Sequence, residues 1–197
     1  MKIKYLSTLK SNISSQTQGG FTLIETIVGI VVLSIVFTIF TSFIYPLSNQ
    51  SAKQVHQIRA AELGQSMINE ILSRAFDENS DMSGGAKRCG EAGYTLCSTV
   101  IGPETGEFRD IVDGVNVNSY DDVDDYDTDD EIITPKNALG ESIADEYIGF
   151  SMKIDVINDA NYDGSGTGNN STAKLITVTV RTPQEFDFVF SVYKANF

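Results

Sequence analysis

The sequence contains no tryptophan, a single histidine and only two cysteines among its 197 residues. His56 and two thiols offer fewer ligands than the four that a structural zinc site needs. Basic residues are also scarce, because 14 lysines and arginines stand against 27 acidic residues and give a formal net charge of −13. A body this negative repels phosphate groups, so we expect no nucleic-acid partner.

Charge is missing altogether from one long stretch of the chain. Residues 26–47 contain no Asp, Glu, Lys or Arg and consist mostly of Ile, Val, Leu and Phe. At a rise of 1.5 Å per residue, such a helix crosses the roughly 30 Å of a bilayer's hydrocarbon layer. We therefore predict a transmembrane helix over residues 21–50. Gly29 should let a neighbouring helix approach closely, and Pro46 should end or bend the helix because proline lacks an amide hydrogen.

The charges on the two sides of this stretch differ in sign. Lys2, Lys4 and Lys10 precede Gly20, whereas all 27 acidic residues follow it, so removal of residues 1–20 would change the formal charge from −13 to −16, with 11 basic residues against 27 acidic ones. Positive charge marks the cytoplasmic side of a membrane segment. We expect residues 1–20 in the cytoplasm and the C-terminal body across the membrane.

The run Gly19-Gly20-Phe21-Thr22-Leu23-Ile24-Glu25 stands directly before the apolar stretch. A secretory signal peptide places its cleavage site after an apolar core of only about 7 to 15 residues. A plain membrane anchor gives no reason for Glu25, since a carboxylate in the membrane is costly. The run resembles the processing site of type IV pilins and of type II secretion pseudopilins.

The resemblance implies that residues 1–20 are a prepilin leader peptide. A membrane prepilin peptidase would cut between Gly20 and Phe21 and methylate the new amino terminus at Phe21. Residues 21–50 would serve first as a transmembrane helix and then as the filament-assembly helix that packs with other major and minor pilins. An inner-membrane pilus assembly platform would drive this transfer, and Glu25 would direct subunit docking. Thr22 and Glu25 also fit a capping box, and both roles can hold at once.

Four later runs resemble minor pilins of mannose-sensitive haemagglutinin (MSHA) pili; they cover residues 59–65, 69–78, 88–91 and 121–126. This resemblance implies a protein without enzymatic activity that takes part in pilus assembly, priming and surface attachment. The chain would be stored in the inner membrane, with a periplasmic C-terminus, and then enter an extracellular pilus. Two alternatives stay open: a minor pseudopilin of a type II secretion system, and a calcium-dependent adhesin domain on a pilus.

Residues 51–197 form the predicted exported headpiece, of class α+β. Apolar residues three or four apart indicate an amphipathic helix that continues the membrane helix; they are Val55, Ile58, Leu63, Met67, Ile68, Ile71, Leu72, Ala75 and Phe76. Residues 79–88 should form the loop after this helix. The long helix should pack on a C-terminal antiparallel β-sheet, the layout that the pilin resemblance also implies.

Three runs near the C-terminus alternate between apolar and polar residues with period two. They cover residues 150–156, 174–181 and 186–193 and are rich in β-branched and aromatic side chains. We predict an antiparallel meander with a short connection at residues 182–185 and a longer loop at residues 158–172. The face that carries Ile176, Val178 and Val180 should cover the helix.

Cys89 and Cys97 are separated by seven residues. In an exported domain such a pair predicts a disulfide, which stabilises a small loop by about 2 to 3 kcal/mol. Zinc binding and thiol catalysis are weaker interpretations, because no further ligand or base is placed beside either thiol.

Carboxylates gather in two places of the headpiece. Residues 100–147 are rich in Gly, Asp and Asn, and residues 121–131 alone carry eight carboxylates. We expect a solvated loop there, with calcium binding as the alternative. A second candidate Ca²⁺ site is the loop whose ligands would be Asp159, Asn161, Asp163 and Ser165. This spacing matches the first half of an EF-hand loop, but Asn170 stands where that loop needs Glu, so an ordinary connecting loop stays open. We expect no other cofactor.

Overall fold

The computed structural model describes residues 19–82 and 85–197. Most of the expected leader therefore lies outside the described residues. The chain divides into two compact units, Met1–Asn49 and Gln50–Phe197. Helix α1 (Leu23–Leu72) contributes to both. Pro46 does not end the helix, because helix is assigned through this residue as far as Leu72. The alternative, a bend at Pro46, stays a prediction. A proline removes only one backbone hydrogen bond, and the turns beyond it are held by the packing of the second unit.

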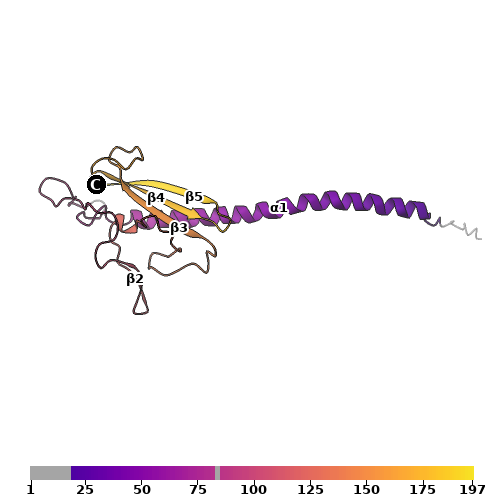
Figure 1. The fold of residues 1–197 in the computed structure, drawn as a ribbon, viewed down its shortest axis with the longest axis horizontal. Helices are drawn as coiled ribbons and strands as arrows, with labels where there is room; N and C mark the ends of the chain where they lie inside the picture. The colour runs from indigo at the N-terminus through magenta and orange to yellow at the C-terminus, as the bar shows by residue number, and fades with distance from the viewer. Residues whose placement is uncertain (1–18, 83–84) are drawn as a thin grey trace, which may run out of the picture. The chain divides into compact units, whose positions relative to one another are not determined.

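The sheet of the second unit is the predicted antiparallel meander. It consists of β3 (Ser151–Asn158), β4 (Ala173–Arg181) and β5 (Asp187–Ala195) in the order β3-β4-β5. Ile154 faces Val178 in the first pair of strands, and Val178 faces Phe190 in the second. All three predicted strands are confirmed, with ends that shift by one or two residues. The strands lie along the C-terminal part of α1 (Figure 1).

The core of the headpiece lies between α1 and the sheet. Alternate residues of β3 and β4 are at most 2% exposed, namely Met152, Ile154, Val156, Ile176, Val178 and Val180. They pack on helix residues spaced three and four apart, which are Ala60, Leu63, Met67, Ile68 and Ile71. This confirms the α+β class and the sheet face that was expected to cover the helix. Burial of this apolar area is the main force that holds the two layers together.

Two residues of the expected apolar stripe are exposed. Val55 and Ile58 are 51% and 60% exposed. On a helix with 3.6 residues per turn, they project about 100° or more away from the face that Ala60, Leu63 and Met67 define. Their assignment to the buried stripe was wrong, because the packed face follows Ala60 and not the nearest large apolar residues.

Helix α1 and strand β5 are in close contact at Gly64. A Cβ atom added to Gly64 would lie 2.4 Å from ring carbons of Phe190. Real Cβ atoms do not come this close to another carbon, so the ring occupies the place that a side chain would need. The contact explains why a glycine stands inside a helix, where it costs about 1 kcal/mol relative to alanine.

Helix α1 ends at Leu72, four residues before the end of the predicted apolar stripe at Phe76. The ammonium of Lys194 donates to the carbonyl oxygen of Leu72 at 2.9 Å, which caps the end of the helix. Beyond it, Ala75 forms a parallel bridge with Asp122. The chain therefore leaves the helix early and joins the acidic segment.

A second, smaller sheet lies within residues 100–147, where no strand was expected. Strands β1 (Arg109–Val112) and β2 (Val115–Asn118) pair antiparallel. The turn residues Asp113 and Gly114 have φ values of 51° and 77°. Positive φ at both central residues is the type I′ geometry that joins two strands through two residues, and Asp-Gly is a preferred sequence for it. The sequence carried this signal, and our prediction overlooked it.

Candidate functional site

The processing motif lies at the start of α1. Helix begins at Leu23, and the backbone N–H of Glu25 donates to the Thr22 hydroxyl at 3.3 Å. This is the first half of the predicted capping box. Gly19 and Gly20 are exposed, and a Cβ atom at either would meet nothing within 4 Å. The bond between Gly20 and Phe21 is therefore open to an approaching enzyme, next to a carboxylate in the first helical turn.

The following turns of α1 are apolar on every side. Leu23–Ile44 has a mean hydropathy of 2.7 over 22 residues, and none of this segment is buried in the structure. Ile24 and Phe43, for example, are each 66% exposed. A helix that is apolar all round requires a membrane or other apolar helices around it. Length and composition therefore fit a single-pass membrane anchor.

The hydroxyl groups within this helix are satisfied by its own backbone. Ser34 donates to the carbonyl oxygen of Ile30 at 2.7 Å, and Thr38 donates to that of Ser34 at 2.9 Å. Thr41 makes the same kind of bond to Phe37 at 3.0 Å. A polar group that is bonded within its own helix costs less in a hydrocarbon environment. These serines and threonines are thus compatible with a membrane.

The two cysteines of the headpiece form a disulfide. Cys89 and Cys97 are bonded, with their Cα atoms 4.8 Å apart. Phe76 packs against them in a small buried cluster. The side-chain amide of Asn196 donates to the carbonyl oxygen of Cys89 at 3.1 Å and so ties the loop to the end of the chain. Bonded sulfurs offer neither a thiolate ligand nor a nucleophile, which removes the zinc and catalytic interpretations for this pair.

A buried lysine organises the acidic side of the headpiece. The side chain of Lys174 is 1% exposed, pairs with Asp124 and lies 3.6 Å from Asp77 Oδ2. Its Nζ atom also donates to the carbonyl oxygen of Phe76 at 2.8 Å. Burial raises the pKa of Asp124, and the Lys174 ammonium opposes this rise. A charged pair this deep is stable only because further polar groups satisfy it.

The expectation of a solvated acidic loop is wrong for Asp122, Asp124 and Asp125. These residues are between 0% and 2% exposed. Asp124, Asp125 and Tyr126 form the short 3₁₀ helix η1 (Asp124–Tyr126), which packs beside β3. Lys174, 50 residues later in the chain, pairs with Asp124. Backbone amides of the same segment donate to Asp122 and Asp125, and a run of acidic residues reveals neither arrangement. Asp121, Asp129, Asp130 and Glu131 are exposed as expected.

The proposed calcium ligands of the 159–165 loop are held by other contacts. Asp159 is fully buried, and its Oδ2 atom accepts hydrogen bonds from Tyr193 Oη and the Gly164 amide, both at 2.7 Å. The exposed Asp163 accepts from the Ser165 amide at 2.8 Å and from the Asn161 side chain at 2.7 Å. These donors shape the loop without an ion. Calcium binding by this loop stays a prediction.

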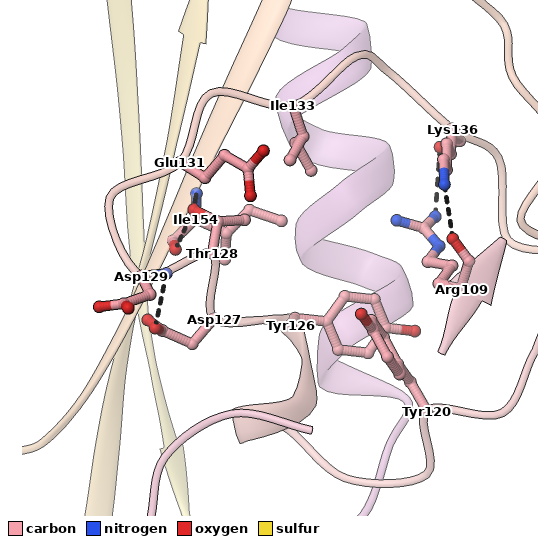
Figure 2. A pocket seen from close by; sticks show the side chains of 10 residues that line it. All are labelled: Arg109, Tyr120, Tyr126, Asp127, Thr128, Asp129, Glu131, Ile133, Lys136 and Ile154. Atoms are coloured by element: carbon pink, nitrogen blue, oxygen red, sulfur yellow. Dashed lines mark hydrogen bonds between the residues drawn. The ribbon is translucent and has the colours of Figure 1, made fainter. Parts of the chain in front are cut away.

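A cavity of about 240 Å³ lies between η1, β3 and the segment from Asp127 to Lys136. Figure 2 shows the rings of Tyr120 and Tyr126 at one end and Glu131 and Ile133 at the other. Arg109 is bound to Glu70 at 3.0 Å and to the Asn137 carbonyl oxygen at 2.7 Å. The guanidinium of Arg109 is thus bonded to groups of the protein itself. No side chain among the cavity's ten lining residues is a histidine, serine or cysteine that could act as a nucleophile with a base.

Comparison with known families places one motif in this chain. The family model described as the prokaryotic N-terminal methylation motif matches residues 15–41. Comparison of the chain with curated proteins and with solved structures finds no significant match. The match covers the Gly-Phe junction, the capped helix start and most of the exposed apolar helix. The chain thus carries a prepilin-type N-terminus of the kind found in type IV pilin-like proteins.

Proposed function

We propose that this protein is a minor pilin of a type IV pilus, most similar to the D minor pilin of MSHA pili. The observation that carries the proposal is the methylation motif at the start of a helix whose apolar side chains are exposed on every side. Such a helix suits two environments in turn, the membrane before assembly and a bundle of like helices afterwards. The protein acts as a building unit, and the chemistry at its N-terminus is performed on it by other proteins.

Under this proposal, the subunit passes through storage, cleavage and assembly. It is stored in the inner membrane with its headpiece in the periplasm. A prepilin peptidase cuts after Gly20 and methylates the amine of Phe21. An inner-membrane assembly platform then moves the cut subunit into a filament with other major and minor pilins, where the headpiece becomes extracellular and takes part in priming and surface attachment.

Two of the runs that resemble MSHA minor pilins support the finer assignment, because they meet in one part of the headpiece. The segment from Asn69 to Glu78 contains Ala75, which bridges to Asp122, and Asp77, which lies beside Lys174. The run from Asp121 to Tyr126 contributes Asp124 to the same lysine. The resemblance therefore concerns residues that build the headpiece core. Similarity among such residues supports a similar headpiece fold.

Immunogold labelling of intact cells tests this proposal. Antibody against the headpiece should label surface filaments, and mass spectrometry of sheared filaments should detect the chain at a small fraction of the major pilin. A deletion strain should lose filaments or attach less well to surfaces, and the cloned gene should restore both. A protein that is confined to the periplasm, together with a secretion defect in the deletion strain, would instead identify a minor pseudopilin.

A further inference from the structure

Three carboxylates gather on the headpiece away from Lys174. One oxygen each from Glu104, Glu107 and Asp125 lies within 4.8 Å of the other two. We call this group the carboxylate cluster. Glu107 also belongs to a neighbouring acidic group with Glu78 and Asp121, so the local charge is strongly negative.

A tight turn holds the two glutamates of the carboxylate cluster together. The Glu107 amide donates to the carbonyl oxygen of Glu104 at 3.0 Å, and the Glu104 amide donates to Glu107 Oε2 at 3.1 Å. Gly106 has a φ of 104°, which a residue with a side chain rarely adopts. The backbone therefore brings two like charges side by side at the cost of their mutual repulsion.

Asp125 supplies an oxygen atom that no donor among the described residues satisfies. This residue is 1% exposed, and its Oδ2 atom accepts hydrogen bonds from the amides of Asp121 and Asp122 at 2.8 and 3.1 Å. Its Oδ1 atom is buried and has no hydrogen-bond donor within the part of the chain that the structure describes. Within residues 19–82 and 85–197, no lysine or arginine pairs with any member of the carboxylate cluster. A buried acceptor of this kind costs folding free energy unless something binds it.

The titration behaviour of the cluster agrees with unbalanced negative charge. Burial raises the pKa of Glu104 and Glu107. Burial, together with the charge of Asp122, raises the pKa of Asp125 to about 7. No cation is among the causes that act on these three groups, whereas Lys174 acts on Asp124 and Arg74 acts on Asp121.

We propose that the carboxylate cluster binds one calcium ion, with Glu104, Glu107 and Asp125 Oδ1 as its protein ligands. Calcium is bound by oxygen atoms at about 2.3 to 2.6 Å, so ligands on opposite sides of the ion lie about 4.6 to 5.2 Å apart. A spacing of at most 4.8 Å places the three oxygens around one ion. The Ser98 hydroxyl, 3.4 Å from Glu104 Oε1, and water molecules would complete the shell. Zinc prefers nitrogen and sulfur ligands, which the cluster lacks, and magnesium requires shorter, regular octahedral bonds.

The bound ion would join two segments that lie far apart in the sequence. The turn at residues 104–107 would be fixed to η1, whose Asp124 pairs with Lys174. Calcium would thereby stabilise the loops on this side of the headpiece. This inference depends only on the headpiece and stands apart from the pilus assignment.

Calorimetry on the full chain in detergent micelles, stripped of metal with a chelator, tests the site. Calcium chloride should give one saturable binding event and raise the temperature of headpiece unfolding. E104Q/E107Q should bind at least tenfold more weakly and gain no thermal stability from calcium. Asp163→Asn is the matched control, because it neutralises the candidate ligand in the 159–165 loop, and it should bind as the unaltered chain does.

The unfolding temperature measured without calcium shows whether a variant that binds less calcium is still folded. E104Q/E107Q should then unfold at the same or a higher temperature than the unaltered chain, because the repulsion between the carboxylates is gone. Terbium provides a second measurement on the unaltered chain: its emission, excited through nearby tyrosines, should fall in Tyr120→Phe and be displaced by calcium. Overturning results would be no calcium binding by the unaltered chain, equal binding by E104Q/E107Q, loss of binding only in Asp163→Asn, or equal affinity for magnesium.

Discussion

Lys174 and Asp124 form an ion pair that is closed off from solvent, with side chains 1% and 2% exposed. The two residues are 50 positions apart, and they connect the middle strand of the sheet to η1. Asp77 and the carbonyl oxygen of Phe76 face the same ammonium. This pair therefore joins the segment after α1, the acidic segment and the sheet.

Lys174→Met should destabilise the headpiece strongly, because it leaves Asp124 and Asp77 buried without their cation. Removal of one partner of a buried pair typically costs about 3 to 5 kcal/mol. Urea unfolding of the full chain, followed by circular dichroism, measures the change. Lys153→Met is the control, since the ion pairs of Lys153 are made with the more exposed Asp130 and Asp155, and its effect should be much smaller. Equal losses from the two variants would contradict this role for Lys174.

Asp125→Asn should stabilise the calcium-free protein at pH 8. The pKa of Asp125 is raised to about 7 in the fold, against about 3.9 in an unfolded chain. The folded state therefore holds the proton more tightly, and the free energy of unfolding decreases as the pH rises from about 4 to about 7 and is level above that. Burial is the main cause of the raised pKa of Asp125; the charge of Asp122 and the Glu107 side chain also raise it, while the backbone amides of Asp121 and Asp122 oppose the rise.

The variant should show a shallower decline over this pH range and a gain on the order of 1 to 3 kcal/mol at pH 8. Thermal unfolding in the presence of a chelator, from pH 4 to pH 8, gives both quantities. Asp113→Asn is the control, because Asp113 is exposed in the β1–β2 turn and its left-handed backbone also accepts Asn. An identical pH profile for Asp125→Asn and the unaltered chain would be evidence against this explanation.

Gly64→Ala should destabilise the headpiece although alanine favours helix. The added methyl group would lie 2.4 Å from the Phe190 ring. Overpacking costs about 1 to 3 kcal/mol and exceeds the gain of about 1 kcal/mol in helix propensity if the ring cannot move away. In a Phe190→Leu background, the same substitution should cost less. Gly29→Ala is the control within the same helix, because nothing lies within 4 Å of that position, and headpiece unfolding should not change.

Gly20→Leu should block processing. A peptidase that cuts at Gly20 must accommodate the backbone closely, and a branched side chain would occupy that space. The variant should accumulate in the membrane as the longer precursor, which gel mobility and N-terminal sequencing detect. Recovery of a product that begins at Phe21 would refute the proposed cleavage site.

Glu25→Ala should be cut and folded normally and yet be depleted from filaments. After cleavage, the new amine would be carried by Phe21, four residues before Glu25 and two residues before the start of α1 at Leu23. In a staggered bundle, the amine of an incoming subunit can meet the carboxylate of a subunit already in place, and an unpaired charge there is costly. Quantitative mass spectrometry of sheared pili measures the ratio. Glu62→Ala, at an exposed position of α1, should remain at the normal ratio. Normal incorporation of Glu25→Ala would leave Glu25 with its capping role alone.

The regular elements of this fold could be predicted from local patterns. Alternation in the runs around Ile154, Val178 and Phe190 identified the three strands, and the apolar stretch after Glu25 identified the helix. The burial of Asp124 could not be predicted, because it depends on Lys174, 50 residues later in the chain. The prediction that Val55 and Ile58 are buried was wrong for a related reason. Hydrophobicity shows which residues can be buried, but the element that packs on the helix decides which residues are buried.

The carboxylate cluster was not predicted from the sequence for the same reason. Nothing in the sequence distinguishes Glu104 and Glu107 from other surface glutamates, and only the fold brings them close to Asp125. By contrast, the hairpin at Asp113-Gly114 was readable from its turn residues and the apolar positions on either side. Local signals thus reach turns, strands and helices, whereas sites built from distant segments require the structure.

The two parts of α1 should tolerate mutation in different ways. Between Leu23 and Ile44 no side chain is buried in the structure, so most replacements of one apolar residue by another should survive selection, whatever their volume, while charged replacements should disappear. At Ala60 and Gly64, where the sheet lies against the helix, volume should be the deciding property, and even a larger apolar residue should be rejected. A saturation library scored for surface filaments would therefore separate one helix into a segment under selection for polarity and a segment under selection for size.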